Sequence, residues 1–183
     1  MTKRRLNVDL DELVVALETS FHEIHHYLDL ETGRIIMITD ETDWQLEEIY
    51  DEILDQDGNP TMPLAEHLQM RDDLQDWFKE ALIEADLVAQ WHGSRFIAVE
   101  PEGPHEDYRD MERFIRTVAD PDLQDRLWRA IGGRGAFRYF KDVLYDYPAV
   151  RERWFAFKAA QSRQRALDWL EWHDIELISD DAP

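Results

Sequence analysis

The sequence contains no cysteine. This absence excludes disulfides, thiolate-bound zinc, iron–sulfur clusters and a cysteine nucleophile, and it fits a reducing compartment. No apolar run approaches the roughly 18 residues needed to span a bilayer, so we expect no membrane-spanning helix. Lys3, Arg4 and Arg5 are followed by Asn7 and Asp9 rather than by an apolar stretch, so we expect no signal peptide and a cytoplasmic location.

Basic residues are scarce: 20 lysines and arginines stand against 41 aspartates and glutamates, and the net charge is -21. Such a chain repels nucleic acid and anionic membranes on average. The basic residues are unevenly distributed along the chain. Residues 126–165 hold ten basic and three acidic side chains, a net charge of +7, and the remaining residues carry a net charge of -28. This segregation indicates either a binding patch or a basic segment that is paired with carboxylates inside the molecule.

The chain has enough apolar material for a core, with 183 residues of which 44% are hydrophobic and 11% aromatic. This length favours a single domain over residues 1–183. The segment from Pro101 to Pro104 marks the alternative, a division into an acidic α/β part over residues 1–100 and a helical, basic-aromatic part over residues 105–178.

Apolar residues spaced three or four positions apart predict most of the helices. We expect helices over residues 8–18, 40–54, 64–88 (one long or two short), from about residue 108, from residue 121, over 136–145, and from residue 148. Asp120 and Pro121 are typical of a helix start, and Gly132 with Gly133 can end that helix in the left-handed conformation. The last helix should bury a stripe formed by Val150, Trp154, Phe157, Leu167 and Leu170.

Strands are expected where β-branched residues follow one another. Residues 24–39 predict a hairpin across Glu31, Thr32 and Gly33, and residues 96–99 and 175–178 predict two short strands. The fold class is therefore α+β, mainly helical, with a small antiparallel sheet built from the hairpin and the short strands. An acidic tail follows from Ser179 to Pro183.

The segment Ile131–Leu144 reads IGGRGAFRYFKDVL and is followed by Pro148 and Trp154. It resembles the signature of a family of uncharacterised bacterial proteins, which has a Gly-x-Gly-Ala-Phe-Arg-x-Phe-Lys-Asp core. The similar stretch runs from about residue 120 to about residue 178, and the hairpin around residues 27–33 resembles the family's N-terminal strand. The resemblance implies a bacterial origin. It implies no catalytic residue, because the family brings no established activity.

The same segment supplies the predicted ligand site: Gly133, Arg134, Gly135, Arg138 and Lys141. Glycine allows close backbone approach, and the free N–H groups at a helix start attract anions. If Arg134 continues the helical register, the three cations share one face. The expected ligand is a small anion or an acidic protein partner. In the alternative interpretation the glycines are only helix caps, and the cations pair with the chain's own carboxylates.

Two further patterns have a structural and a functional interpretation. Trp154 and Phe157 among arginines suggest base stacking, although a helical stripe of aromatics is more often core. The string from His22 to His26 matches H-E-x-x-H, but it lies where helix gives way to strand. There the two histidines are about 13 Å apart and cannot share a zinc ion. We therefore expect no metal site and no cofactor.

Together these patterns favour a non-enzymatic binding or regulatory module. One alternative is an enzyme that acts on an anionic small molecule, with Arg134 and Arg138 holding its charge. The other is a nucleic-acid-associated protein, which the charge of -28 outside the basic window disfavours. The oligomeric state is left open.

Overall fold

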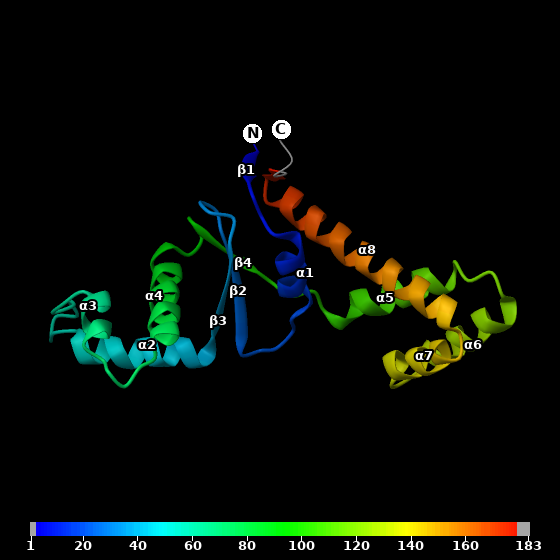
Figure 1. The fold of residues 1–183 in the computed structure, drawn as a ribbon, viewed down its shortest axis with the longest axis horizontal. Helices are drawn as coiled ribbons and strands as arrows, with labels where there is room; N and C mark the ends of the chain where they lie inside the picture. The colour runs from blue at the N-terminus through cyan, green and yellow to red at the C-terminus, as the bar shows by residue number, and fades with distance from the viewer. Residues whose placement is uncertain (1–2, 179–183) are drawn as a thin grey trace. The chain divides into compact units, whose positions relative to one another are not determined.

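The computed structural model describes residues 3–178, apart from the side chain of Pro104, and the predicted acidic tail from Ser179 lies outside them. Eight helices and five strands are present in this range, which confirms a mainly helical α+β fold (Figure 1). Backbone contacts group the chain into two units: a mixed unit of residues 3–100 and 175–178, and a helical unit of residues 101–174. The single-domain expectation stays a prediction.

The mixed unit is built around a three-stranded antiparallel sheet in the order β3-β2-β4. Its strands are β2 (Ile24–Asp29), β3 (Ile35–Thr39) and β4 (Phe96–Val99), so the predicted hairpin and the 96–99 strand are confirmed. The helices are α1 (Leu10–Glu18), α2 (Asp40–Ile53), α3 (Leu64–Gln69) and α4 (Asp76–Trp91). The 64–88 region therefore forms two helices.

The core of this unit forms where one face of the sheet meets α2, α3 and α4. Ile36 and Ile38 pack there with Ile49, Leu82 and Phe96, all of them buried. The alternation of β3 explains the arrangement, because successive side chains point to opposite faces: Met37, between the two isoleucines, is 58% exposed.

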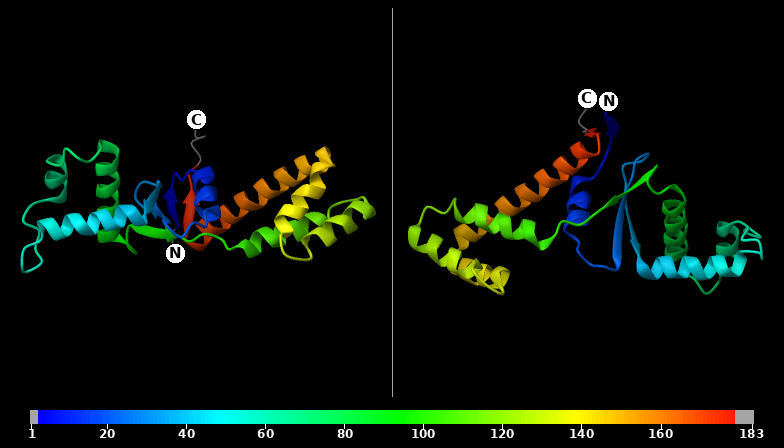
Figure 2. Two further views of the ribbon diagram at one scale, coloured as in Figure 1. Left: turned by 90° about the horizontal axis from the view of Figure 1, so that it is seen from below. Right: turned by 180° about the vertical axis from the view of Figure 1, so that it is seen from behind.

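The sequence-based placement of the last strand was wrong. β5 (Ile175–Leu177) does not join the hairpin sheet but pairs in parallel with β1 (Arg4–Leu6), a strand that the sequence analysis did not predict (Figure 2). Three residues with two arginines carry little apolar periodicity, so β1 gives almost no local signal. The pairing brings together segments from opposite ends of the described chain.

The helical unit contains α5 (Pro104–Ile115), α6 (Pro121–Ile131), α7 (Ala136–Tyr145) and α8 (Pro148–Trp172). Asp120 caps α6 as predicted, since its carboxylate accepts hydrogen bonds from the N–H groups of Asp122 and Leu123. The buried stripe of α8 differs from the prediction at one position. Leu167 is 37% exposed, and Ala166 takes its place in the interior.

An aromatic cluster holds α5, α7 and α8 together. The ring of Trp154 lies 5.2 Å from that of Phe114 on α5 and 4.9 Å from that of Phe140 on α7, in edge-to-face arrangements. All three side chains are at most 5% exposed. Trp154 is therefore a core residue and is not available to stack on a base, which supports the structural interpretation of the aromatic stripe.

Trp154→Ala should lower the free energy of unfolding by about 3–5 kcal/mol, because it empties the centre of this cluster. Trp172→Ala is the matched control on the same helix. Its side chain is 86% exposed, so the change should stay within about 0.5 kcal/mol. Chemical denaturation of both variants measures the difference, and equal stabilities would contradict the assignment of Trp154 to the core.

A buried ion pair lies at the end of β2 in the mixed unit. Arg95 donates two hydrogen bonds to the buried Asp29 carboxylate, over 2.9 and 2.7 Å, and the Glu31 N–H and the Thr32 hydroxyl donate two more. Burial alone would raise the pKa of Asp29, but these donors outweigh it and lower the pKa to about 2.

Asp29→Asn should therefore cost about 2 kcal/mol of stability at neutral pH. The carboxylate titrates near 3.8 in the unfolded chain and near 2 when folded, so its contribution is present above pH 4 and is lost as the pH falls toward 2. Urea titrations of wild type and variant at several pH values check this. A stability difference that stays constant down to pH 2 would contradict it.

Candidate functional site

The candidate site begins at the turn between α6 and α7. Gly135 is the N-cap of α7 and has a left-handed backbone (φ 82°, ψ 18°), while Gly132 caps the end of α6 with φ -71°. The sequence analysis placed the left-handed residue at Gly132 or Gly133, and this was wrong: neither has a positive φ. The chain turns at the start of the new helix instead.

This turn separates the predicted cations. Gly133, Arg134 and Gly135 lie in the turn, and Arg138 and Lys141 lie on α7, and all five are exposed. Because the left-handed Gly135 interrupts the helix, Arg134 does not continue the register of α7. The condition for a single row of three cations is therefore not met. Arg138 and Lys141 still lie one turn apart on the helix.

The surrounding stretch is basic throughout. Residues 126–141, called here the basic segment, contain five basic and no acidic side chains: Arg126, Arg129, Arg134, Arg138 and Lys141. The α7 start within it has no acidic residue in its first turn and no side-chain cap. Its first N–H groups have no acceptor within the helix, so their partial positive charge adds to that of the side chains.

Carboxylates neutralise this segment only weakly. The Arg138 Nε atom lies 3.9 Å from the Asp142 carboxylate, with side chains that are 86% and 64% exposed. Arg126 lies at the same distance from Asp146. Within the described residues, Arg134 and Lys141 have no ion pair. Exposed pairs at this separation contribute little free energy, so the positive potential of the segment persists.

Several cations of α5 and α8 are paired much more closely. The Arg165 guanidinium lies 2.7 Å from the buried Asp110 carboxylate, contacts Glu102, and donates to the Ser162 hydroxyl over 3.1 Å. Burial raises the pKa of Glu102 even though Arg165 opposes the shift. Basic side chains in the helical unit are thus of two kinds, and five of the weakly paired ones lie together in the basic segment.

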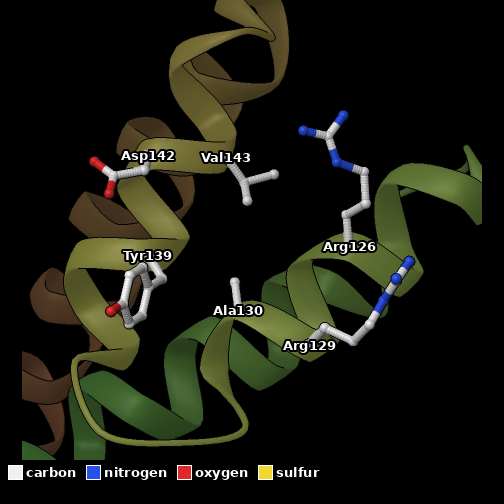
Figure 3. A pocket seen from close by; sticks show the side chains of 6 residues that line it. All are labelled: Arg126, Arg129, Ala130, Tyr139, Asp142 and Val143. Atoms are coloured by element: carbon white, nitrogen blue, oxygen red, sulfur yellow. The ribbon is translucent and has the colours of Figure 1, made fainter.

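A groove runs between α6 and α7 beside this turn, and we call it the basic groove. Its volume is about 480 Å³, and it is lined by Arg126, Arg129, Ala130, Tyr139, Asp142 and Val143 (Figure 3). Ala130 and Val143 lie between the two helices, the arginines extend from α6, and Tyr139 and Asp142 extend from α7.

The two arginines of the groove are positioned by neutral groups. Arg126 donates to the Tyr147 hydroxyl over 2.8 Å and lies 5.5 Å from the centre of that ring. Arg129 donates to the backbone oxygen of Asp125 over 3.1 Å. These contacts orient the guanidinium groups and leave their charge in place.

A second groove, called here the aromatic groove, lies between α7 and α8. It has a volume of about 470 Å³ and is lined by Lys141, Asp142, Leu144, Tyr145, Arg151, Trp154 and Phe155. Lys141 is the one predicted site residue among the lining residues of either groove. Nothing in the sequence singles out Tyr139, Tyr145 and Phe155, because aromatic residues next to a predicted core stripe are usually expected to be buried.

The metal-binding interpretation of the H-E-x-x-H string gains no support. His22 lies in a turn and His26 in β2, so the string does not form the helix that a zinc peptidase needs. His25 contacts Asp40 over 2.9 Å. Between residues 3 and 178, no three histidine or carboxylate side chains form a metal-binding group. No helix in that range is long and apolar enough to cross a bilayer.

Comparison with known proteins supports the resemblance seen in the sequence. Residues 83–182 match the model of UPF0158, an uncharacterised protein family. A UPF0158 protein of Pseudomonas aeruginosa is 28% identical over 180 residues, which cover 98% of this chain and 92% of the relative. UPF0158 proteins of Chlamydia trachomatis and Chlamydia muridarum are each 26% identical over 69 residues, 37% of this chain and 21% of theirs. No solved structure matches.

Gly135→Ala should destabilise the helical unit by about 1–2 kcal/mol, because the left-handed backbone conformation is sterically unfavourable for alanine. Its Cβ would also lie 3.1 Å from the Tyr139 ring. Gly133→Ala is the control, since a Cβ there meets nothing within 4 Å and the change should stay within about 0.5 kcal/mol. Thermal denaturation of both variants measures this, and an unchanged Gly135→Ala protein would contradict the turn geometry.

Proposed function

This chain belongs to UPF0158, an uncharacterised protein family, and we propose that its helical unit is a non-enzymatic binding module for an acidic partner or an anionic ligand. The site consists of the basic segment and the basic groove beside it. The α6–α7 turn, with Gly133, Arg134 and Gly135, forms one end, and Arg138 and Lys141 continue it along α7.

One observation carries this proposal: the five cations of the basic segment lack close carboxylate partners, in a chain that has twice as many acidic as basic residues. Elsewhere in the same unit, several lysine and arginine side chains have close carboxylate partners, as in the 3.2 Å pair of Lys158 with Asp107. A positive potential that persists in so acidic a chain attracts carboxylates or phosphates at short range.

Binding fits the grooves better than catalysis does. Enzyme sites exclude water from the reacting groups, which strengthens the electrostatic interactions inside. The basic groove leaves Tyr139 54% exposed and Arg126 45% exposed, so solvent reaches its walls. An open groove of this kind suits the recognition of a surface or a peptide segment.

The distribution of charge favours a short acidic segment over nucleic acid. The helical unit has 13 basic and 14 acidic residues, a net charge of -1, so the mixed unit with the flanking residues carries the remaining -20. Nucleic acid spreads its charge over many phosphates and meets this repulsion, whereas a short segment needs only the local cations. Because the chain contains no cysteine, we propose that this module acts in the cytoplasm.

Replacing both Arg134 and Arg138 by Glu should weaken binding of a fluorescein-labelled deca-glutamate peptide at low salt by about tenfold or more. The two side chains are exposed, so the fold should be unchanged. Fluorescence polarisation measures the affinity, and circular dichroism checks the fold.

The matched control replaces Arg5 and Arg116 by Glu, which changes the net charge equally at two exposed positions outside the basic segment. It should leave most of the binding intact. Equal affinity of wild type and the Arg134/Arg138 variant would remove the site. Tighter, equally variant-sensitive binding of a single-stranded RNA of matched charge would favour the nucleic-acid alternative instead.

A further inference from the structure

The aromatic groove combines an apolar floor with a charged rim. Leu144 and Trp154 form the floor and are 1% and 5% exposed, while Tyr145 and Phe155 form walls that are 73% and 56% exposed. Large apolar side chains exposed to this extent beside a hollow of about 470 Å³ are typical of a surface that binds another protein.

Cations stand at the rim of this groove. The Arg151 guanidinium lies 5.8 Å from the centre of the Tyr145 ring, which holds both side chains in position, and Lys141 extends from α7. Neither Lys141 nor Arg151 has a carboxylate partner among residues 3–178. Asp142 is the one acidic residue that lines the groove, so the two cations leave the lining with a net charge of +1.

We propose that the aromatic groove receives an aromatic side chain of a short acidic peptide segment, with the flanking carboxylates of that segment paired to Lys141 and Arg151. This inference rests on the proposed function and specifies the kind of partner that would bind beside α7. The exposed rings of Tyr145 and Phe155 supply apolar contact for the ring, and the rim supplies charge complementarity for the acids. The occupant is thus a protein segment in which Asp or Glu residues surround a Trp, Tyr or Phe.

A peptide fits this groove better than a small molecule or RNA. Small-molecule sites bury most of their ligand, whereas walls that are more than half exposed leave a free ligand open to water. A peptide covers its inserted side chain with its own backbone. RNA bases bind by lying flat on exposed rings, whereas the buried floor of Leu144 and Trp154 lies at the bottom of a hollow.

The test uses two labelled peptides of equal charge, Asp-Glu-Asp-Trp-Asp-Glu-Asp and the same sequence with Gly in place of Trp. The full chain should bind the Trp peptide about tenfold more tightly than the Gly peptide, as measured by fluorescence polarisation. Tyr145→Ala combined with Phe155→Ala should abolish this preference. Trp172→Ala, which removes an even more exposed aromatic of α8 that is not among the groove's lining residues, should preserve it.

The outcomes separate this inference from the proposed function. One outcome is that both peptides bind equally and both are weakened by the Arg134→Glu and Arg138→Glu pair. That result would show that the aromatic groove does not bind the aromatic side chain, while the proposed binding function of the basic segment would be supported. A Trp preference that survives the Tyr145 and Phe155 changes also overturns the inference. If neither peptide binds at low salt, both proposals fail. If single-stranded RNA binds more tightly than the Trp peptide and depends on Phe155, the occupant is a nucleobase.

Discussion

The packing of Trp154 against Phe114 and Phe140 is the interaction on which the rest of the helical unit depends. It ties α5, α7 and α8 into one core and thereby fixes which sides of α7 face solvent. One side of α7 borders the basic groove with Tyr139, and the other borders the aromatic groove, whose floor is Trp154 itself. The same indole ring thus stabilises the fold and shapes the surface that we propose for binding.

The arrangement of charge follows from how the helices use their acidic residues. In α5 and α8, carboxylates and guanidinium groups meet at short distances, as Asp110 and Arg165 do. In the basic segment, acidic residues are missing from 16 consecutive positions, so Arg134 has no carboxylate partner there and Arg138 reaches Asp142 only at 3.9 Å. A unit with a net charge of -1 can therefore carry a local positive surface, because its ion pairs are unevenly distributed and not because cations are in excess.

Much of the fold could be predicted from sequence where local signals are strong. The bounds of α7 and the capped start of α6 at Asp120 follow from apolar periodicity and from helix-start chemistry. The β1–β5 pairing could not be predicted, because it joins residues about 170 positions apart and β1 has no local pattern. Leu167 was assigned to the core because a 25-residue helix accumulates small errors in register.

The candidate site was predictable in composition but not in geometry. The five residues around the α6–α7 turn are exposed, but three glycines lie within four positions, and the sequence does not show that Gly135 is the left-handed one that separates Arg134 from the helix. The aromatic groove also escaped prediction. Tyr145 and Phe155 sit one position from the buried Leu144 and Trp154, and only the packing of α7 on α8 decides which of each pair is buried.

The central claim is that positive potential persists along the start of α7. Nuclear magnetic resonance measures it directly, by comparing the relaxation of backbone amides in the presence of an anionic and of a cationic nitroxide of the same size. The account predicts stronger relaxation by the anionic probe at the amides of residues 133–141. It also predicts the reverse preference along the acidic α2. Equal relaxation by both probes at residues 133–141, or a stronger effect of the cationic one, would contradict it.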